Sequence, residues 1–344
     1  MQLDLSVLET VAPDVLDVLQ QRFLILRNIY WMQPVGRRLL AEKIGLTERV
    51  LRSQTDILRN LQLLHISKSG MILTKAGVNS VQNLEKMMDV LQGFHLMENK
   101  LKGYFGIRKV TIVAGDSDVQ KKILEEFGSV VTQILDDLLP DGENIIATMG
   151  GTTMSVVAAN LSKLETKMRH NIFVPARGGI GEAISVQANS VSEKMAQHAG
   201  GKHHTLYVPE HVRQETYELL IEEPAIQEVL QLVKQANCVI HSIGLALHMA
   251  ARRKMTEEEI IKIKQFGAVA ESFGYFFNKE GMVVYKLPRI GLKLSQLETI
   301  PVILAVASGK SKAQAIHAYM KNAPKKTWFI TDEAAACEIL KMIG

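Results

Sequence analysis

One contiguous stretch decides the fold of the amino-terminal part of the chain: residues 36–60 have the sequence GRRLLAEKIGLTERVLRSQTDILRN. Its apolar spacing predicts a short helix over 37–44. Gly45 is expected to end that helix, and Thr47 is expected to cap the next one. A helix-turn-helix needs a small residue for close packing, here Ala41, and a residue that tolerates positive φ at its turn.

The second helix of this motif has two faces. The residues expected to face the core are Val50, Leu51, Ile57, Leu58 and Leu61. The opposite face carries polar and cationic side chains at helical spacing: Arg49, Arg52, Ser53, Asp56 and Asn60. A cation-bearing ridge of this kind fits the major groove of DNA.

A hairpin is expected directly after the motif. Residues 63–74, LLHISKSGMILT, form two short β segments around a turn at 68–70, and a further helix is expected over 15–31. A helix-turn-helix followed by a basic-tipped hairpin is a winged helix. The side chains predicted to contact DNA are Arg49, Arg52 and Ser53 at base edges or phosphates, Arg37, Arg38 and Lys68 on the backbone, and Thr47 at the helix start.

Charge is unevenly distributed along the chain. Residues 22–75 hold ten basic and three acidic side chains, a net charge of +7 in a chain whose total is +4. A local positive field is typical of a surface that contacts nucleic acid. A solvated helix face would explain any single arginine, and some winged domains bind protein. The motif, the wing and the charge together favour DNA.

The pattern over about 78–101 is again helical. It spans one and a half heptads, which is too short for a coiled coil but enough for a helix that packs on a partner. A linker helix packed on its own domain explains it equally well. A dimer would suit DNA binding, because two half-sites supply the affinity that one winged helix lacks.

Beyond residue 105 short β runs alternate with helices, which predicts a mostly parallel sheet covered on both faces. The expected strands are 109–114, 144–149, 171–174, 204–208, 238–243, 301–307 and 328–331. In such sheets ligands bind beyond the carboxyl ends of the strands.

Four of these strand ends carry groups suited to a phosphorylated ligand. They are the glycine turn 150–153 with its two threonines, the segment 173–181 with Arg177, the segment 306–312 with Lys312, and the turn 243–245. Backbone N–H groups at a helix start bind phosphate, and arginine binds it bidentately. Neither a GxxxxGK[ST] nor a GxGxxG motif is present. From the residues alone, Arg252 to Lys254 are best explained as a solvated helix end.

The motifs GRRLLAEKIGLTERVLR, VAGDSD, GGTT, FVPARGG, IIEEP, AESFGYFFN and SKAQAI together resemble the SorC family of bacterial regulators. The resemblance spans nearly the whole chain. It implies an α/β fold with a winged helix-turn-helix over 1–77, a linker or dimerisation helix over 78–102, and a Rossmann-like sugar-binding domain over 103–344. That domain is similar to ribose-phosphate isomerases and glucosamine-phosphate deaminases, and the family implies a homo-oligomer, a dimer that forms a tetramer on its operator.

For the subgroup that the chain resembles, the family implies repression of a glycolytic operon, relieved by fructose 1,6-bisphosphate. The implied effector-binding residues are Thr152, Thr153, Arg177, Gly178, Gly179, Gln187, Arg252, Glu271 and Lys312. The resemblance thus reverses the interpretation of Arg252, because a bisphosphate needs a second cationic anchor. No cofactor and no metal are implied.

A sugar-phosphate isomerase or deaminase is the main alternative. Such an enzyme needs a general base and acid aimed at the sugar carbons. The corresponding turn is expected at 241–248, where His248 could serve as a base but no aspartate is present. A third alternative is an adaptor that binds neither DNA nor sugar.

The remaining features fit a protein of the cytoplasm. Cys238 and Cys337 lie in apolar runs without the spacing of a zinc site or a disulfide framework. The first residues are acidic and unlike a signal peptide, and no apolar run approaches the roughly 20 residues that a membrane helix needs. We therefore expect neither export nor membrane insertion.

Overall fold

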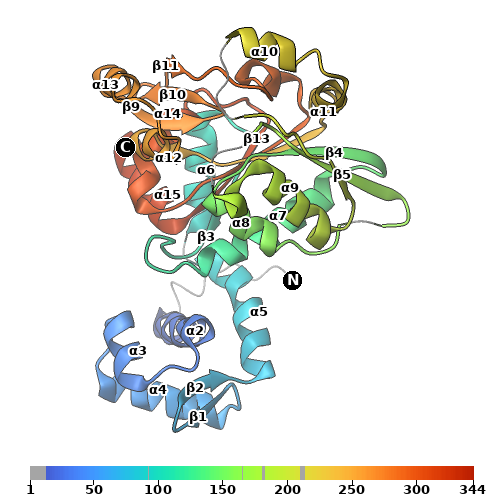
Figure 1. The fold of residues 1–344 in the computed structure, drawn as a ribbon. Helices are drawn as coiled ribbons and strands as arrows, with labels where there is room; N and C mark the ends of the chain where they lie inside the picture. Colours follow the sequence, from blue (N-terminus) through green and yellow to red (C-terminus); the bar gives the residue numbers. More distant parts are fainter. Residues whose placement is uncertain (1–12, 92, 165, 180–182, 210–213) are drawn as a thin grey trace. The chain divides into compact units, whose positions relative to one another are not determined.

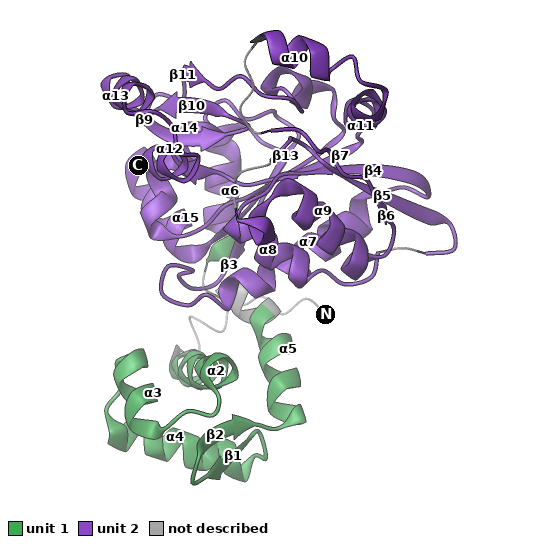
Figure 2. Cartoon of the chain, viewed as in Figure 1, with its two compact units in different colours: residues 1–95 green, residues 96–344 purple. Residues whose placement is uncertain are grey.

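The chain forms two compact units. The computed structural model describes residues 13–91, 93–164, 166–179, 183–209 and 214–344. Unit 1 comprises residues 1–95 and unit 2 residues 96–344, and each has its own hydrophobic core (Figure 2). The sequence prediction set a separate connecting segment at 78–102, whose boundaries stay a prediction.

Unit 1 is a winged helix, as predicted. Its elements are α2 (Pro13–Met32), α3 (Arg37–Ile44), α4 (Glu48–Asn60), β1 (Leu64–Ser67), β2 (Gly70–Leu73) and α5 (Lys75–Leu91). Gly45 ends α3 in the left-handed conformation, at φ 71°. The Thr47 side chain accepts a hydrogen bond from the N–H of Val50 at 3.3 Å and so caps α4. The predicted helix-turn-helix is therefore confirmed at both of its boundary residues.

The wing is tied to the helices by backbone pairing. Val35, which precedes α3, exchanges two backbone hydrogen bonds with Met71 on β2. Two residues predicted for the core are instead exposed: Val50 by 37% and Leu61 by 55%. The buried side of α4 is the narrower stripe of Leu51, Thr55 and Leu58. Val50 lies beside that stripe, and Leu61 follows the last residue of the helix.

Two helices occupy the range for which one connecting helix was predicted. Helix α5 ends at Leu91, and α6 (Phe94–Phe105) begins within the same range. The α6 side chains of Leu101 and Phe105 are buried in unit 2. The single-helix prediction was wrong because a helical apolar pattern continues through a break when both helices have buried faces.

Unit 2 is built on a seven-stranded parallel sheet with the order β3-β13-β12-β7-β4-β5-β6. Its strands are β3 (Lys109–Val113), β4 (Gly142–Thr148), β5 (Arg169–Pro175), β6 (Lys202–His203), β7 (Cys238–His241), β12 (Val302–Val306) and β13 (Thr327–Asp332). The expected parallel sheet is confirmed. The strand predicted at 204–208 is not: its Leu206 and Val208 leave the sheet and pack in a cluster with Val229 of α11.

Helices lie on both faces of this sheet. The helices of this part of the chain are α7 (Ile123–Leu138), α8 (Thr152–Ala159), α9 (Ala188–Ala199), α10 (Gln214–Leu220), α11 (Pro224–Lys234), α14 (Ala313–Met320) and α15 (Glu333–Ile343). Helices α7, α8 and α9 lie together on one side and α11 on the other (Figure 1). Ile145 and Ala147 pack with Val233 of α11. Because alternate residues of a strand point to the same face, these two β4 side chains lie on the face that α11 covers. Among the described helices, none is long and apolar enough to cross a membrane.

A second sheet was not predicted. It has four antiparallel strands in the order β11-β10-β9-β8, namely β11 (Val283–Lys286), β10 (Tyr275–Asn278), β9 (Ala268–Ser272) and β8 (Gly244–Leu245). It is reached from β7 through β8, and helices α12 (Ala246–Arg252) and α13 (Glu257–Gln265) lie between β8 and β9 in the chain. This small sheet carries Glu271 on β9. It therefore brings a carboxylate toward the edge of the large sheet.

Candidate functional site

The four strand ends singled out in the sequence converge. They follow β12, β7, β4 and β5, which are consecutive neighbours in the large sheet. Beyond their carboxyl ends lies an open cavity. Its lining residues are Met149, Gly150, Gly151, Thr152, Thr153, Arg177, Ser242, Ile243, Gly244, Met249, Arg252, Arg253, Glu271, Ser272, Phe273 and Lys312. We call this space the effector cavity.

The turn between β4 and α8 presents backbone N–H groups to the effector cavity. Gly150 is needed there, because a Cβ at this position would collide with the carbonyl oxygen of Val186. The N–H of Gly151 donates to that same carbonyl at 2.8 Å, so it is not available to a ligand. The N–H groups of the first turn of α8, which starts at Thr152, have no partner within the helix. With the hydroxyls of Thr152 and Thr153, they can bind an anion.

Arg177 is held rigidly at the end of β5. It is 3% exposed, and its backbone forms a bridge with Gly291. The neighbouring residues are fixed on both sides, since Leu292 donates to the carbonyl of Ala176 at 2.7 Å and Gly178 donates to the carbonyl of Ile290 at 3.1 Å. A guanidinium on so constrained a backbone loses little further entropy when it binds an anion.

Lys312 reaches the effector cavity from the turn before α14. Asp332 anchors this turn by accepting the N–H of Gly309 at 3.0 Å, and Asp118 accepts the N–H of Ser311 at 2.8 Å. Burial lowers the pKa of Lys312, and the carboxylates of Asp118 and Asp332 oppose that shift. A bound phosphate would add a further negative charge beside this ammonium and favour its charged form.

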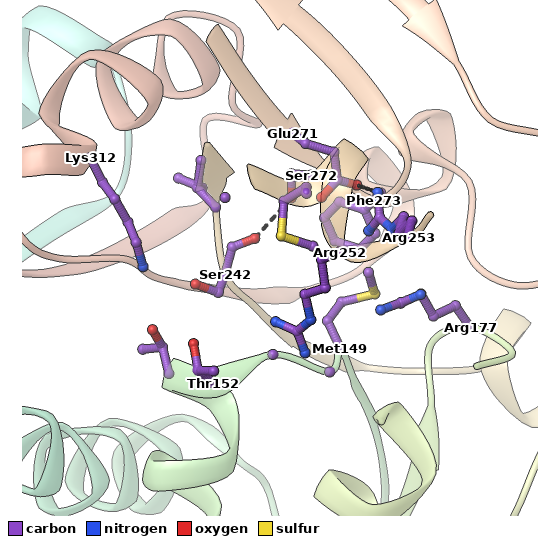
Figure 3. Close-up of a pocket in the computed structure, with 16 residues that line it drawn as sticks. Met149, Thr152, Arg177, Ser242, Arg252, Arg253, Glu271, Ser272, Phe273 and Lys312 are labelled. Carbon is purple, nitrogen blue, oxygen red and sulfur yellow. Dashed lines mark hydrogen bonds and ion pairs between the residues drawn. The ribbon is translucent and has the colours of Figure 1, made fainter. Parts of the chain in front are cut away.

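Arg252, Arg253 and Glu271 complete the lining. Figure 3 shows Lys312 entering from one side and Arg177 from the other, with Arg252 extending into the space between them. Arg253 forms an ion pair of 2.9 Å with Glu271 and is 6% exposed. The interpretation of 252–254 as a solvated helix end is therefore wrong, because two of the three side chains turn into the cavity.

Most of the predicted effector residues meet here. Six of them line the effector cavity: Thr152, Thr153, Arg177, Arg252, Glu271 and Lys312. Gly178 and Gly179 follow Arg177 but are not part of the lining. Gln187 is also outside the lining, and its backbone packs against Gly150. Among the residues that sequence reasoning missed are Met149, Ser242, Arg253 and Phe273. The adjacency of Arg253 to Arg252 was visible, but its burial was not.

The candidate base of the isomerase or deaminase alternative does not lie in the cavity. Among the described residues that line it there is no histidine and no aspartate. His248, the candidate base, is exposed and lies outside the lining. His241 is fully buried between Phe273 and Tyr319, and burial lowers its pKa to about 4. The only lining carboxylate among the described residues, Glu271, is paired with Arg253.

The predicted DNA-contacting side chains are largely exposed on unit 1. Arg38, Arg49, Arg52, Ser53 and Lys68 are all exposed. Arg37 is half-buried, 3.6 Å from Asp56, and Thr47 is occupied as the helix cap. One of the ten cations counted in this region does not contribute to the surface: Arg27 is 5% exposed, 3.4 Å from Glu85, with its guanidinium over the ring of Trp31.

Each unit matches a known protein family. Residues 18–88 match a family model described as the CggR N-terminal DNA binding domain, and residues 90–341 match one described as a sugar-binding domain. The chain is 40% identical over 337 residues to the central glycolytic genes regulator of Priestia megaterium, covering 98% of each chain. It is 41% identical over 331 residues to the regulator of the same name from Bacillus subtilis, covering 96% of each.

A solved structure is similar to unit 2. It is a SorC family transcriptional regulator from Enterococcus faecalis, with 64% identity and a TM-score of 0.69 over 72% of this chain and all of that one. A DNA-binding winged helix joined to a sugar-binding α/β unit with a cationic cavity defines a ligand-responsive transcriptional regulator, not an enzyme. The chain belongs to the SorC family of these regulators, among the central glycolytic genes regulators.

Proposed function

We propose that this regulator represses glycolytic genes and that fructose 1,6-bisphosphate, bound in the effector cavity, relieves the repression. The observation that carries the choice of ligand is the placement of the cations. Lys312 stands with the first turn of α8 on one side of the cavity, and Arg177 on the other (Figure 3). Two separate cationic positions match a ligand with two phosphates, and a carboxylate matches its hydroxyls.

Each predicted effector residue has a role in this proposal. Lys312, Thr152 and Thr153 bind one phosphate together with the N–H groups of α8. Arg177 and Arg252 bind the second phosphate. Glu271 accepts hydrogen bonds from the sugar hydroxyls. The backbone of Gly178 and Gly179 and the side chain of Gln187 reach the ligand from just outside the lining.

The DNA side of the proposal rests on unit 1. The exposed side chains of Arg49, Arg52 and Ser53 on α4 enter the major groove, while Arg38 and Lys68 hold the phosphate backbone. Arg37 and Thr47 belong to the same set. We further propose that the protein is a homo-oligomer, a dimer that forms a tetramer on its operator, and that it works in the cytoplasm, where its DNA is.

Two measurements test the proposal. In a thermal-shift comparison of fructose 1,6-bisphosphate, fructose 6-phosphate, glucose 6-phosphate and inorganic phosphate, the bisphosphate should stabilise the protein most. In fluorescence anisotropy with labelled DNA from upstream of its own operon, the same bisphosphate should release the protein from DNA. Stabilisation by none of the four compounds would contradict the sugar half, and undetectable DNA binding at low salt would contradict the repressor half.

A further inference from the structure

A carboxylate in a cavity for phosphates needs an explanation. Glu271 lies in the effector cavity among cations, yet it would repel an anionic ligand at short range. Its side chain is only 5% exposed, so water screens it little. A buried carboxylate of this kind is tolerated only when partners compensate its charge and satisfy its hydrogen bonds.

Two guanidinium groups and one backbone N–H lie close to one oxygen of this carboxylate. Glu271 Oε1 lies 2.9 Å from a guanidinium nitrogen of Arg253 and 3.9 Å from one of Arg289, and it accepts the N–H of Gly274 at 2.6 Å. The side chains of Arg253 and Arg289 are 1% and 9% exposed. The hydrogen bond from Gly274 and the closer ion pair both go to Oε1, so we assign the other oxygen, Oε2, to accept hydrogen bonds from a ligand.

The chain is shaped locally to hold this arrangement. Phe273 and Gly274 form a tight turn between β9 and β10, at φ 52° and 75°. The guanidinium of Arg289 packs against Gly274 so closely that a Cβ there would collide with it. A glycine is thus required both for the turn and for the approach of Arg289 to Glu271.

The same segment that supplies Arg289 also holds Arg177. Residues 287–292 donate from Leu287 to the carbonyl of Gly274 at 2.9 Å and from Leu292 to the carbonyl of Ala176 at 2.7 Å. The segment 287–292 therefore positions Arg177 and, through Arg289, the carboxylate of Glu271. Their spacing is fixed before any ligand binds.

We infer that Arg253 and Arg289 are positioning residues that act through Glu271 and make the effector cavity select sugar phosphates over phosphate compounds without hydroxyls. By compensating and orienting Glu271, they turn a repulsive group into a specific acceptor for hydroxyls. A ligand with two phosphates but no hydroxyls donates no hydrogen bond to Oε2 of that buried carboxylate, so the cost of desolvating this oxygen is not offset. This inference rests on the proposed function of the cavity.

The test compares two ligands of equal charge that share one ring. Isothermal titration calorimetry on the full chain would measure the dissociation constants of fructose 1,6-bisphosphate and of the bisphosphate of 2,5-bis(hydroxymethyl)tetrahydrofuran, which keeps the five-membered ring but lacks the hydroxyls. We expect the wild type to prefer the sugar by about tenfold or more. Arg253→Met should weaken sugar binding by roughly tenfold to a hundredfold and bring the ratio of the two constants toward one.

Controls separate positioning from structure and from net charge. Lys254→Met removes an exposed cation next to Arg253 and should leave both constants unchanged. Arg253→Lys should restore part of the preference. In a Glu271→Gln background, Arg253→Met should no longer alter the ratio, because the group through which it acts is gone. If Arg253→Met does not fold, Arg289→Met answers the same question with the less tightly paired arginine.

The outcomes are distinct. A wild-type chain that binds neither bisphosphate overturns the proposed function itself. A wild-type chain that binds both equally well overturns only the inference about selectivity. So does an Arg253→Met variant with the wild-type ratio, or an effect on the ratio that persists when Glu271 is glutamine.

Discussion

The two units of this regulator assemble their functional surfaces in opposite ways. In unit 1 the side chains proposed to contact DNA lie within residues 37–68, on two helices and a hairpin that are contiguous in sequence, and most of them are exposed. In unit 2 the cavity gathers residues from 149 to 312, and its charged members are mostly buried and braced by other residues. Substituting one exposed side chain of the first kind of surface should change binding little. Substituting a buried side chain that other residues hold in place should change it more.

This difference predicts the largest effect in unit 2. Arg177→Ala or Lys312→Ala should weaken fructose 1,6-bisphosphate binding by about a hundredfold, because each removes one partner of a shielded charge pair. Operator binding without ligand should persist, which anisotropy would check. Lys310→Ala is the matched control, since Lys310 belongs to the same turn but its side chain is 62% exposed. Wild-type sugar affinity and full release in both variants would show that the sugar binds elsewhere.

Acid should destabilise unit 2 through His241. Its folded-state pKa of about 4 lies below the ordinary value of 6.5, so the unfolded chain takes up this proton first. As pH falls from 6.5 to 4, this histidine should remove about 3 kcal/mol from the free energy of unfolding. Denaturant titrations followed by Trp328 fluorescence in a Trp31→Phe variant report on unit 2. His241→Phe should flatten the pH dependence of the free energy of unfolding. An unchanged pH dependence in that variant would show that His241 does not cause the loss of stability in acid.

A smaller effect is expected on DNA binding. Arg49→Ala with Arg52→Ala should weaken operator binding by about tenfold or more and reduce the slope of log affinity against log salt by about two if both contact phosphates. Sugar binding should not change. The control is the double change Lys262→Ala and Lys264→Ala, which removes the same charge from exposed positions on α13. Equal losses in the two double variants would mean that only net charge matters.

The smallest effect concerns the start of α4. Thr47→Ala removes the hydrogen bond to the N–H of Val50 and should lower the stability of unit 1 by about 1 kcal/mol, while Thr47→Asp should keep it. Trp31 fluorescence in a Trp328→Phe variant would follow unit 1 alone. Unchanged stability in Thr47→Ala, with DNA binding lost, would mean that Thr47 acts on DNA and not as a cap.

The two units also differ in how much of their structure could be predicted from the sequence. In unit 1 the roles of Gly45 and Thr47 follow from residue type and position in the local sequence, so the turn and the cap were predicted correctly. The assignments of Val50 and Leu61 failed because the width of a buried stripe depends on the tertiary partner, which the helical period does not contain. In unit 2 the strand ends were predictable, since apolar runs that stop at glycine turns mark the carboxyl edge of a parallel sheet.

The rest of the cavity depends on contacts distant in sequence. The small antiparallel sheet that carries Glu271 was missed because its strands are short and β8 has only two residues, Gly244 and Leu245. Arg253 and Arg289 are separated from Glu271 by 18 residues each, and nothing in the local pattern indicates that they meet it. A basic triplet at a helix end is usually solvated. Only the fold shows that Arg253 turns inward.

We propose that sugar binding in unit 2 and DNA binding in unit 1 are coupled, and coupled sites must affect each other reciprocally. Calorimetry would measure the affinity of fructose 1,6-bisphosphate for the free regulator and for the regulator saturated with operator DNA. If the sugar weakens operator binding by some factor, the operator must weaken sugar binding by the same factor. We predict that the affinity for the DNA-bound protein is weaker by that factor, and an identical affinity for both forms would show that the two sites are not coupled.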